Sequence, residues 1–103
     1  MHVPYMKYEW DENKRCSNLF KHGLDFIVAD RVLANPYRLD VESRRNNEVR
    51  IQSFAYVFDV LTVLTVIHLP SKQSSRIISF RRASRDERGV YYEWLENDYK
   101  NIR

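Results

Sequence analysis

The sequence predicts an α+β fold in which helices pack on one mostly antiparallel sheet. Three runs in the second half of the chain, at residues 48–55, 60–69 and 76–81, are dense in β-branched and aromatic side chains, as strands are. Helical patterns come before and after these runs rather than between them, which is typical of α+β domains. A chain of 103 residues supports one hydrophobic core, so a single domain over residues 1–103 is expected.

The beginning of the chain predicts a short strand and then a helix. Residues 1–5 show no regular pattern and are expected to form an irregular lead, whereas residues 8–10 alternate as in a strand. Asp11 suits the cap of a helix that runs to His22, and Gly23 can end that helix in a left-handed turn.

A second helix is expected to begin at the capping residue Asp25 and to stop before the pair Asn35-Pro36. Its apolar face carries Phe26, Ala29, Val32 and Leu33. After a short strand near Tyr37, residues 38–47 are polar and have no apolar face, which predicts a mobile surface loop.

The rest of the chain predicts antiparallel strands and a final helix. The last two strand-like runs are joined by residues 70–75, which are rich in turn formers, so the strands are expected to pair as antiparallel neighbours. Ser84 and Glu87 have the spacing of a capping box, which starts the final helix. Apolar residues follow at helical spacing, namely Val90, Tyr91, Trp94 and Leu95.

Positive charge is concentrated in one stretch of the chain. The formal net charge is +3, and residues 76–88 alone hold five arginines and two acids, which is also +3. Such a cluster favours anionic partners, because each guanidinium can offer two donors to one phosphate. Cys16 is the single cysteine, and neither a signal sequence nor an apolar run of membrane-spanning length occurs, so a cytoplasmic protein without membrane contact is expected.

Cofactor-dependent chemistry has no support in the sequence. There is no His-x-x-x-His or Cys-x-x-Cys pair and no tight acidic cluster, so neither a metal site nor another cofactor is expected. A glycine-rich phosphate loop is absent from the sequence, which argues against nucleotide-driven mechanisms. Composition permits a Ser-His-Asp arrangement, but no nucleophile elbow supports one.

The arginines of the last strand are the first candidates for phosphate binding. On a regular strand Arg76 and Arg82 share a face and Arg81 points to the other, so either Arg81 or Arg82 can face a cleft while the other is solvated. Bidentate recognition by Arg76 together with Arg81 or Arg82 is one interpretation. Charged residues at the edge of a sheet, without a ligand, are the other.

Two further pairs have both a functional and a structural interpretation. Glu48 and Arg50 lie two residues apart on a strand and therefore place a carboxylate beside a guanidinium, either in a site or in an ordinary ion pair. Lys21 and His22 lie at a helix end, where the helix dipole favours cations regardless of function. Of these two, Lys21 is the preferred candidate for a cleft.

Histidine and aromatic side chains complete the candidates. A histidine titrates near neutral pH and can serve as an acid or a base, but His68 lies in an apolar strand and also fits a hydrogen-bonded core residue. Tyr91 or Tyr92 can donate to phosphate or stack on a base, although a stripe with Trp94 also fits a core. Trp10 has the same two interpretations.

Several short motifs follow one another in a fixed order along the chain. They are Trp10-Asp11, Asn18, Lys21-His22-Gly23, Phe26, Ala29, Asn35-Pro36, Glu48 and Arg50, Arg76-Ile77-Ile78-Ser79, Arg81-Arg82-Ala83-Ser84, Glu87-Arg88 and Tyr91 or Tyr92. The series spans residues 8–92 and is more specific than any one motif. In this order it resembles the BrnT family, the ribonuclease toxins of the BrnT and BrnA type II toxin-antitoxin systems.

The resemblance implies a RelE-like fold and a metal-independent endoribonuclease that cleaves RNA and inhibits translation. It also implies a BrnA-like antitoxin whose ribbon-helix-helix part binds operator DNA. With it, the expected catalytic residues are Glu48, Arg50, Arg76, Arg81 and Lys21, and the expected RNA-binding residues are Arg82, Tyr91, Trp10 and His68. A non-catalytic RNA-binding or transcription-linked module that uses the same basic cleft is the alternative.

Overall fold

The computed structural model describes residues 7–71 and 74–102, and the expected lead at residues 1–5 lies outside them. The elements are β1 (Lys7–Glu9), α1 (Glu12–His22), the 3-10 helix η1 (Phe26–Val28), α2 (Asp30–Leu33), β2 (Leu39–Arg45), β3 (Glu48–Val57), β4 (Thr62–Pro70), β5 (Ser74–Arg82) and α3 (Arg85–Ile102). The strands form one five-stranded sheet in the order β1, β5, β4, β3, β2. Strands β2 to β5 pair antiparallel and β1 runs parallel to β5, so the predicted α+β class is confirmed.

Helix α1 forms as predicted and is fastened to the edge of β5. The Asp11 carboxylate accepts hydrogen bonds from the backbone N–H groups of Asn13 and Lys14, and Gly23 ends the helix with a left-handed φ of 71°. The buried Asn18 amide then donates to the carbonyl of Phe80 and accepts from its N–H. This pairing satisfies the β5 backbone beyond the end of β1 and fixes α1 beside the sheet.

The second predicted helix is wrong as a single element. Asp25 does cap this segment, through the N–H of Ile27, but η1 follows first and α2 then has four residues. The N–H of Ala29 bonds to the carbonyl of Phe26, three residues back, which is the 3-10 pattern. Two β-branched residues, Ile27 and Val28, disfavour a regular α-helical turn there. The predicted apolar face is nevertheless buried.

The predicted loop at residues 38–47 is also wrong, because Leu39–Arg45 form strand β2. Asn46 and Asn47 have φ angles of 51° and 65°, so they make the two-residue turn that joins β2 to β3. As an edge strand that is exposed on both faces, β2 needs no apolar stripe and gives no hydrophobic signal. The short strand expected near Tyr37 is instead a turn, in which the N–H of Tyr37 bonds to the Asn35 side chain.

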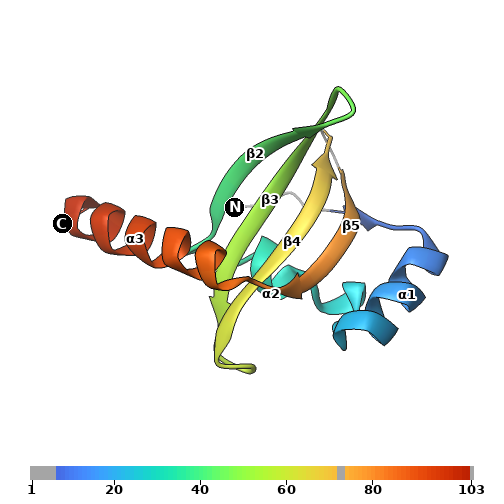
Figure 1. Cartoon of the computed structure of the whole chain (residues 1–103), viewed down its shortest axis with the longest axis horizontal. Helices are drawn as coiled ribbons and strands as arrows, with labels where there is room; N and C mark the ends of the chain where they lie inside the picture. Colours follow the sequence, from blue (N-terminus) through green and yellow to red (C-terminus); the bar gives the residue numbers. More distant parts are fainter. Residues whose placement is uncertain (1–6, 72–73, 103) are drawn as a thin grey trace, which may run out of the picture.

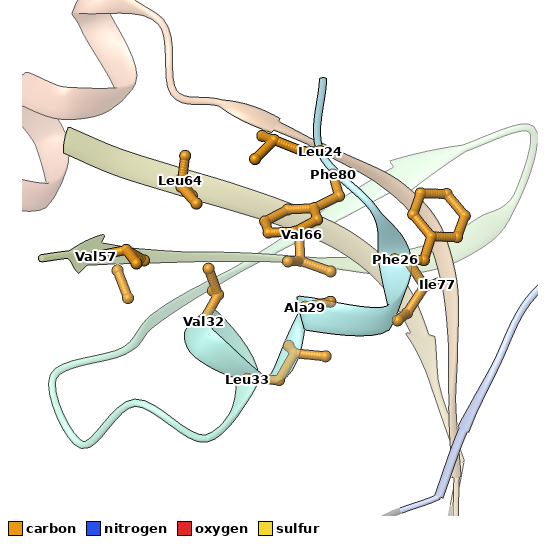
Figure 2. Close-up of a cluster of buried hydrophobic side chains, with 11 residues drawn as sticks. Leu24, Phe26, Ala29, Val32, Leu33, Val57, Leu64, Val66, Ile77 and Phe80 are labelled. Atoms are coloured by element: carbon orange, nitrogen blue, oxygen red, sulfur yellow. The ribbon is translucent and has the colours of Figure 1, made fainter. Parts of the chain in front are cut away.

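One face of the sheet packs against η1 and α2, and Figure 2 shows the side chains that meet there. An irregularity in the pairing of β4 with β5 shapes this core: His68 opposes Ile77 but Ile67 opposes Ser79, so Ile78 is an extra residue in β5. Because of this β-bulge, Ile77 and Phe80 both point into the core although they are three residues apart. The strand is therefore not regular.

The other face of the sheet is covered by α3 at one end. Phe54, Val63, Ala83 and Tyr91 form a second buried cluster there. The predicted capping box is present, since the Glu87 carboxylate accepts from the N–H of Ser84 and the Ser84 hydroxyl accepts from the N–H of Glu87. Figure 1 shows α3 running out from the sheet on the side opposite to α1. Neither α3 nor any other described helix is long and apolar enough to span a membrane.

Candidate functional site

The β-bulge brings Arg76 and Arg81 to the same face of the sheet. Cross-strand partners share a face, and Arg81 pairs with Thr65 while Arg76 pairs with Leu69. Thr65 and Leu69 lie four residues apart on β4 and thus point the same way. The expectation for a regular strand, with Arg76 and Arg82 on one face, is wrong here because the extra residue Ile78 reverses the alternation.

Strand β3 contributes its polar residues to the same face. Gln52 pairs with Ile67 of β4, and Ile67 pairs in turn with Ser79 of β5. Glu48 and Arg50 alternate in phase with Gln52 and therefore project from the same side. We call the surface formed by these side chains the arginine face; its residues are Glu48, Arg50, Gln52, Arg76, Ser79 and Arg81.

A tight network at one end of the arginine face joins Arg81 to helix α3. Two guanidinium nitrogens of Arg81 donate to the two carboxylate oxygens of Glu87, at 2.8 and 3.0 Å. The Gln52 amide donates to the same carboxylate at 2.6 Å. The bond from Arg81 is the largest cause that lowers the pKa of Glu87 from 4.5 to about 2, and the same bond raises the pKa of Arg81. Both groups are therefore charged, and Glu87 holds Arg81 in one orientation.

Thr65 adds an unusual polar atom beside this network. It is fully buried, it is the cross-strand partner of Arg81, and its Oγ1 has no hydrogen-bond partner among the described residues. A buried hydroxyl without a partner is costly, so such atoms are uncommon in folded proteins.

Glu48 and Arg50 form a second ion pair, which the sequence spacing allowed. The Arg50 guanidinium lies 3.2 Å from the Glu48 carboxylate, and about half of the Glu48 side chain, 49%, is exposed against 25% for Arg50. Arg76 differs from both other arginines of this face: it is exposed and has no ion-pair partner in the described part of the chain. Its positive charge is thus fully available to a ligand.

Lys21 and His22 lie at the border of the arginine face, where the end of α1 meets β5. Both line a shallow depression of about 330 Å³ that also includes Asn18, Ile78 and Ser79. Partial burial lowers the pKa of His22, and the nearby charges of Lys21 and Arg81 lower it further. The structure therefore brings Lys21 into the neighbourhood of Arg81, together with a histidine that is neutral at neutral pH.

Four candidate residues lie elsewhere. Arg82 is exposed but pairs with Leu64, whose side chain belongs to the core on the opposite face. Tyr91 is buried, and its hydroxyl donates to the carbonyl of Tyr37 at 2.7 Å. Trp10 packs edge-on against the buried ring of Phe26, and its indole N–H donates to Glu12.

His68 is also remote from the arginine face. It is buried, and its Nε2 lies 2.8 Å from the hydroxyl of Ser53, which in turn donates to Asp40 at 2.6 Å. Since the hydroxyl proton goes to Asp40, His68 is the donor in the first bond. Burial is the main cause that lowers the pKa of His68, so the ring is neutral. A hydrolase triad needs histidine between serine and acid, whereas here the serine is in the middle, and both Ser53 and His68 are buried.

Two residues of this site were not selected from the sequence. The spacing of Gln52 from Glu48 and Arg50 would have placed it on the same strand face. Because its amide is uncharged, it does not stand out as a candidate for phosphate binding. Glu87 was interpreted only as part of the capping box, and sequence spacing alone does not reveal its bond to Arg81. In the described part of the chain, no group of three His, Cys, Asp or Glu residues could hold a metal ion.

Comparison with known protein families finds one that matches most of this chain. Residues 10–87 match the model of a family described as the ribonuclease toxin, BrnT, of type II toxin-antitoxin systems. The match covers α1, all strands from β2 to β5 and the first turn of α3, and thus every residue of the arginine face. No curated protein matches the chain significantly.

Proposed function

Because the chain belongs to the BrnT family of ribonuclease toxins, we propose that it is an endoribonuclease that cleaves RNA without a metal ion and thereby inhibits translation. The observation that carries this proposal is the placement of Arg50, Arg76 and Arg81 on one open sheet face beside a partly exposed carboxylate. Guanidinium groups at such a place can hold the RNA backbone and balance the charge that builds up on phosphorus.

The arginines bind the scissile phosphate in this proposal. Arg76 has no competing carboxylate among the described residues, so it takes the phosphate first. Arg81 is held by Glu87 and by the carbonyl of Arg82 through its terminal nitrogens, which leaves its Nε–H and one Nη2–H as donors for the phosphate. Arg50, next to Glu48, contacts the phosphate or its neighbour in the chain.

Proton transfer needs one group on each side of that phosphate. The Glu48 carboxylate takes the proton of the 2′-hydroxyl as its oxygen attacks phosphorus. The bond to the 5′-oxygen then breaks, and the ammonium group of Lys21 protonates the leaving oxygen. In this proposal Glu48, at the start of β3, and Lys21, at the end of α1 beside β5, act on opposite sides of the phosphate. The products are a 2′,3′-cyclic phosphate and a 5′-hydroxyl.

The other RNA-binding candidates have lesser roles. Arg82, exposed on the opposite face, can contact only flanking RNA. Trp10, His68 and Tyr91 receive no role, because their side chains are committed to the core or to internal hydrogen bonds.

The family implies an antitoxin partner, and we infer that it is BrnA-like. Its ribbon-helix-helix part would bind operator DNA in the complex while the rest silences the toxin. A RelE-like relationship of the fold and a cytoplasmic location, where RNA substrates and ribosomes lie, belong to the same inference.

Cleavage by the purified toxin, freed of antitoxin, tests the activity. Single-stranded and structured RNA should be cut both with Mg²⁺ and with EDTA, and the new ends should carry cyclic phosphate. The Glu48→Gln variant should lose about a hundredfold or more in cleavage rate but keep its affinity for RNA. Cleavage that requires Mg²⁺, or no cleavage in either buffer, would overturn the mechanism.

A second candidate function is a non-catalytic RNA-binding or transcription-linked module. The observation in its favour is that Arg50 and Arg81 each already have a carboxylate partner, as structural ion pairs do. In that case the Glu48→Gln variant should behave like the parent protein. Only substitutions of the arginines should weaken RNA binding, and they should make RNA affinity less dependent on salt.

A further inference from the structure

A groove lies on α3 away from the arginine face. It has a volume of about 630 Å³ and a mostly apolar lining, and its walls come from the segment before β2, the end of β3 and the middle of α3. Its principal lining residues are Asn35, Tyr37, Tyr56, Phe58, Tyr92 and Leu95. We call it the tyrosine groove.

The tyrosine groove exposes large aromatic side chains to solvent. Phe58 is 81% exposed, Tyr37 51% and Tyr92 45%. Phe58 stands edge-on to the half-buried ring of Tyr56, with 5.3 Å between ring centroids. Contiguous apolar surface of this kind is uncommon on a protein that acts alone and usually marks an interaction site.

The walls of the groove are fixed before any ligand arrives. The Tyr91 hydroxyl donates to the carbonyl of Tyr37, and the Asn35 amide donates to the carbonyl of Tyr56 at 3.2 Å. An ion pair between Arg31 of α2 and Asp59 holds the turn that carries Phe58. A partner therefore meets a preformed surface and loses little free energy in ordering it.

Charge decides which kind of partner fits. Glu96 is the charged residue that lines the groove, and the same part of α3, residues 90–98, also carries Glu93 and Asp98 but no basic residue. The acidic residues of this part of α3 repel the RNA backbone, whereas the arginine face attracts it. They favour a protein segment that has lysine or arginine next to its apolar side chains.

We propose that the tyrosine groove is the docking site for a segment of the antitoxin with at least two large apolar side chains flanked by basic residues. This inference rests on the proposed function, since a toxin of this family needs such a partner. Glu87 contacts Gln52 and Arg81 in the first turn of α3, whereas Tyr92 and Leu95 line the groove one to two turns further along the helix, so the two surfaces lie at different places along α3. Docking there does not depend on the arginines.

Three variants of the groove and one matched control test the proposal. Phe58→Ser and Tyr92→Ser remove exposed rings that are not themselves members of the buried clusters, and Glu96→Lys reverses the charge that lines the groove. Phe20→Ser is the control, because Phe20 is 95% exposed on α1, away from the groove. The probe is the antitoxin encoded with the toxin, titrated calorimetrically into each purified toxin variant.

Phe58→Ser and Tyr92→Ser should each weaken antitoxin binding at least about tenfold, as anchor residues of interfaces do. Glu96→Lys should weaken it several-fold, and Phe20→Ser should leave it unchanged. Cleavage of RNA by the free variants should equal that of the parent. Unchanged antitoxin affinity in both serine variants overturns the proposal.

Two other occupants would also overturn it. If cleavage falls while antitoxin binding persists, the groove holds RNA, and if a dimer of the free toxin dissociates instead, the groove holds a second copy. Antitoxin affinity is measured without any cleavage step. A toxin that binds its antitoxin through the groove but cuts no RNA therefore refutes the proposed function and leaves this inference standing.

Discussion

The Glu87 carboxylate controls how much positive charge the arginine face offers. It accepts hydrogen bonds from Arg81, Gln52 and the backbone of Ser84, so its negative charge is held in place by three partners. A phosphate that binds Arg81 must share the guanidinium with this carboxylate. Glu87 therefore orients Arg81 and at the same time lowers the affinity of the site for anions.

Glu87→Gln should separate these two effects. Glutamine can keep the capping box, because its side-chain oxygen still accepts from the N–H of Ser84, but it removes the negative charge. We expect RNA to bind several-fold more tightly and the dependence on salt to become steeper, as measured by fluorescence anisotropy across salt concentrations. Weaker binding would show that orientation of Arg81 matters more than its free charge.

The same carboxylate predicts how stability depends on pH. The pKa of Glu87 falls from 4.5 to about 2 on folding, so its stabilising effect is complete above pH 4.5 and is lost as the pH falls toward 2. The pair is partly solvated, so we expect a contribution of roughly 1 to 2 kcal/mol. Urea unfolding of the parent and of Glu87→Gln between pH 6 and pH 2.5 measures it. If the free energy of unfolding changes with pH in the same way in both proteins, this assignment is wrong.

At the scale of elements, a chain of hydrogen bonds that is buried at Ser53 and His68 links the three strands β2, β3 and β4. Asp40 accepts from Ser53, Ser53 is bonded to His68, and Arg38 pairs with Asp40 at 2.9 Å. The strand pairs themselves are in register at these positions, since Asp40 opposes Ser53. This chain fixes the alignment of β2, an edge strand with few apolar contacts.

Ser53→Ala should destabilise the fold but leave the rate of RNA cleavage by the folded protein unchanged. The substitution strands the buried Nε2–H of His68 without an acceptor, at a cost of about 1 to 3 kcal/mol. Denaturant unfolding measures that loss, with the exposed Ser43→Ala on β2 as the control. A loss no larger than that of the control would mean that the hydrogen-bond chain does not hold the strands.

The sequence predicts an element when that element buries apolar side chains or has a recognisable cap. The helix caps, the strands around residues 48–55, 60–69 and 76–81 and the capping box at Ser84 were predicted, because apolar periodicity and capping chemistry are local. Strand β2 was not predicted, because both of its faces are exposed to solvent and its sequence has no apolar stripe. The bulge at Ile78 left no local signal, and it alone decides that Arg81 rather than Arg82 joins Arg76.

At the scale of the whole molecule, opposite charges lie at different places. Residues 76–88 carry +3 and residues 90–98 carry three acids without a base, although they follow each other in the chain. The first group supplies Arg76 and Arg81 to the arginine face, and the second lies in α3, which runs out from the sheet (Figure 1). Such a separation steers RNA and a basic protein segment to different surfaces of one small domain.

If arginines on one sheet face bind the phosphate that is cleaved, Arg76→Ala and Arg82→Ala should differ sharply in their effect on cleavage. Both residues are exposed, both come from β5 and neither has an ion-pair partner in the described part of the chain, but only Arg76 belongs to the arginine face. Single-turnover cleavage of RNA should fall about a hundredfold in Arg76→Ala and less than about threefold in Arg82→Ala. Equal losses in the two variants would contradict the account, because a diffuse positive charge, and not a face built by the bulge, would then explain the activity.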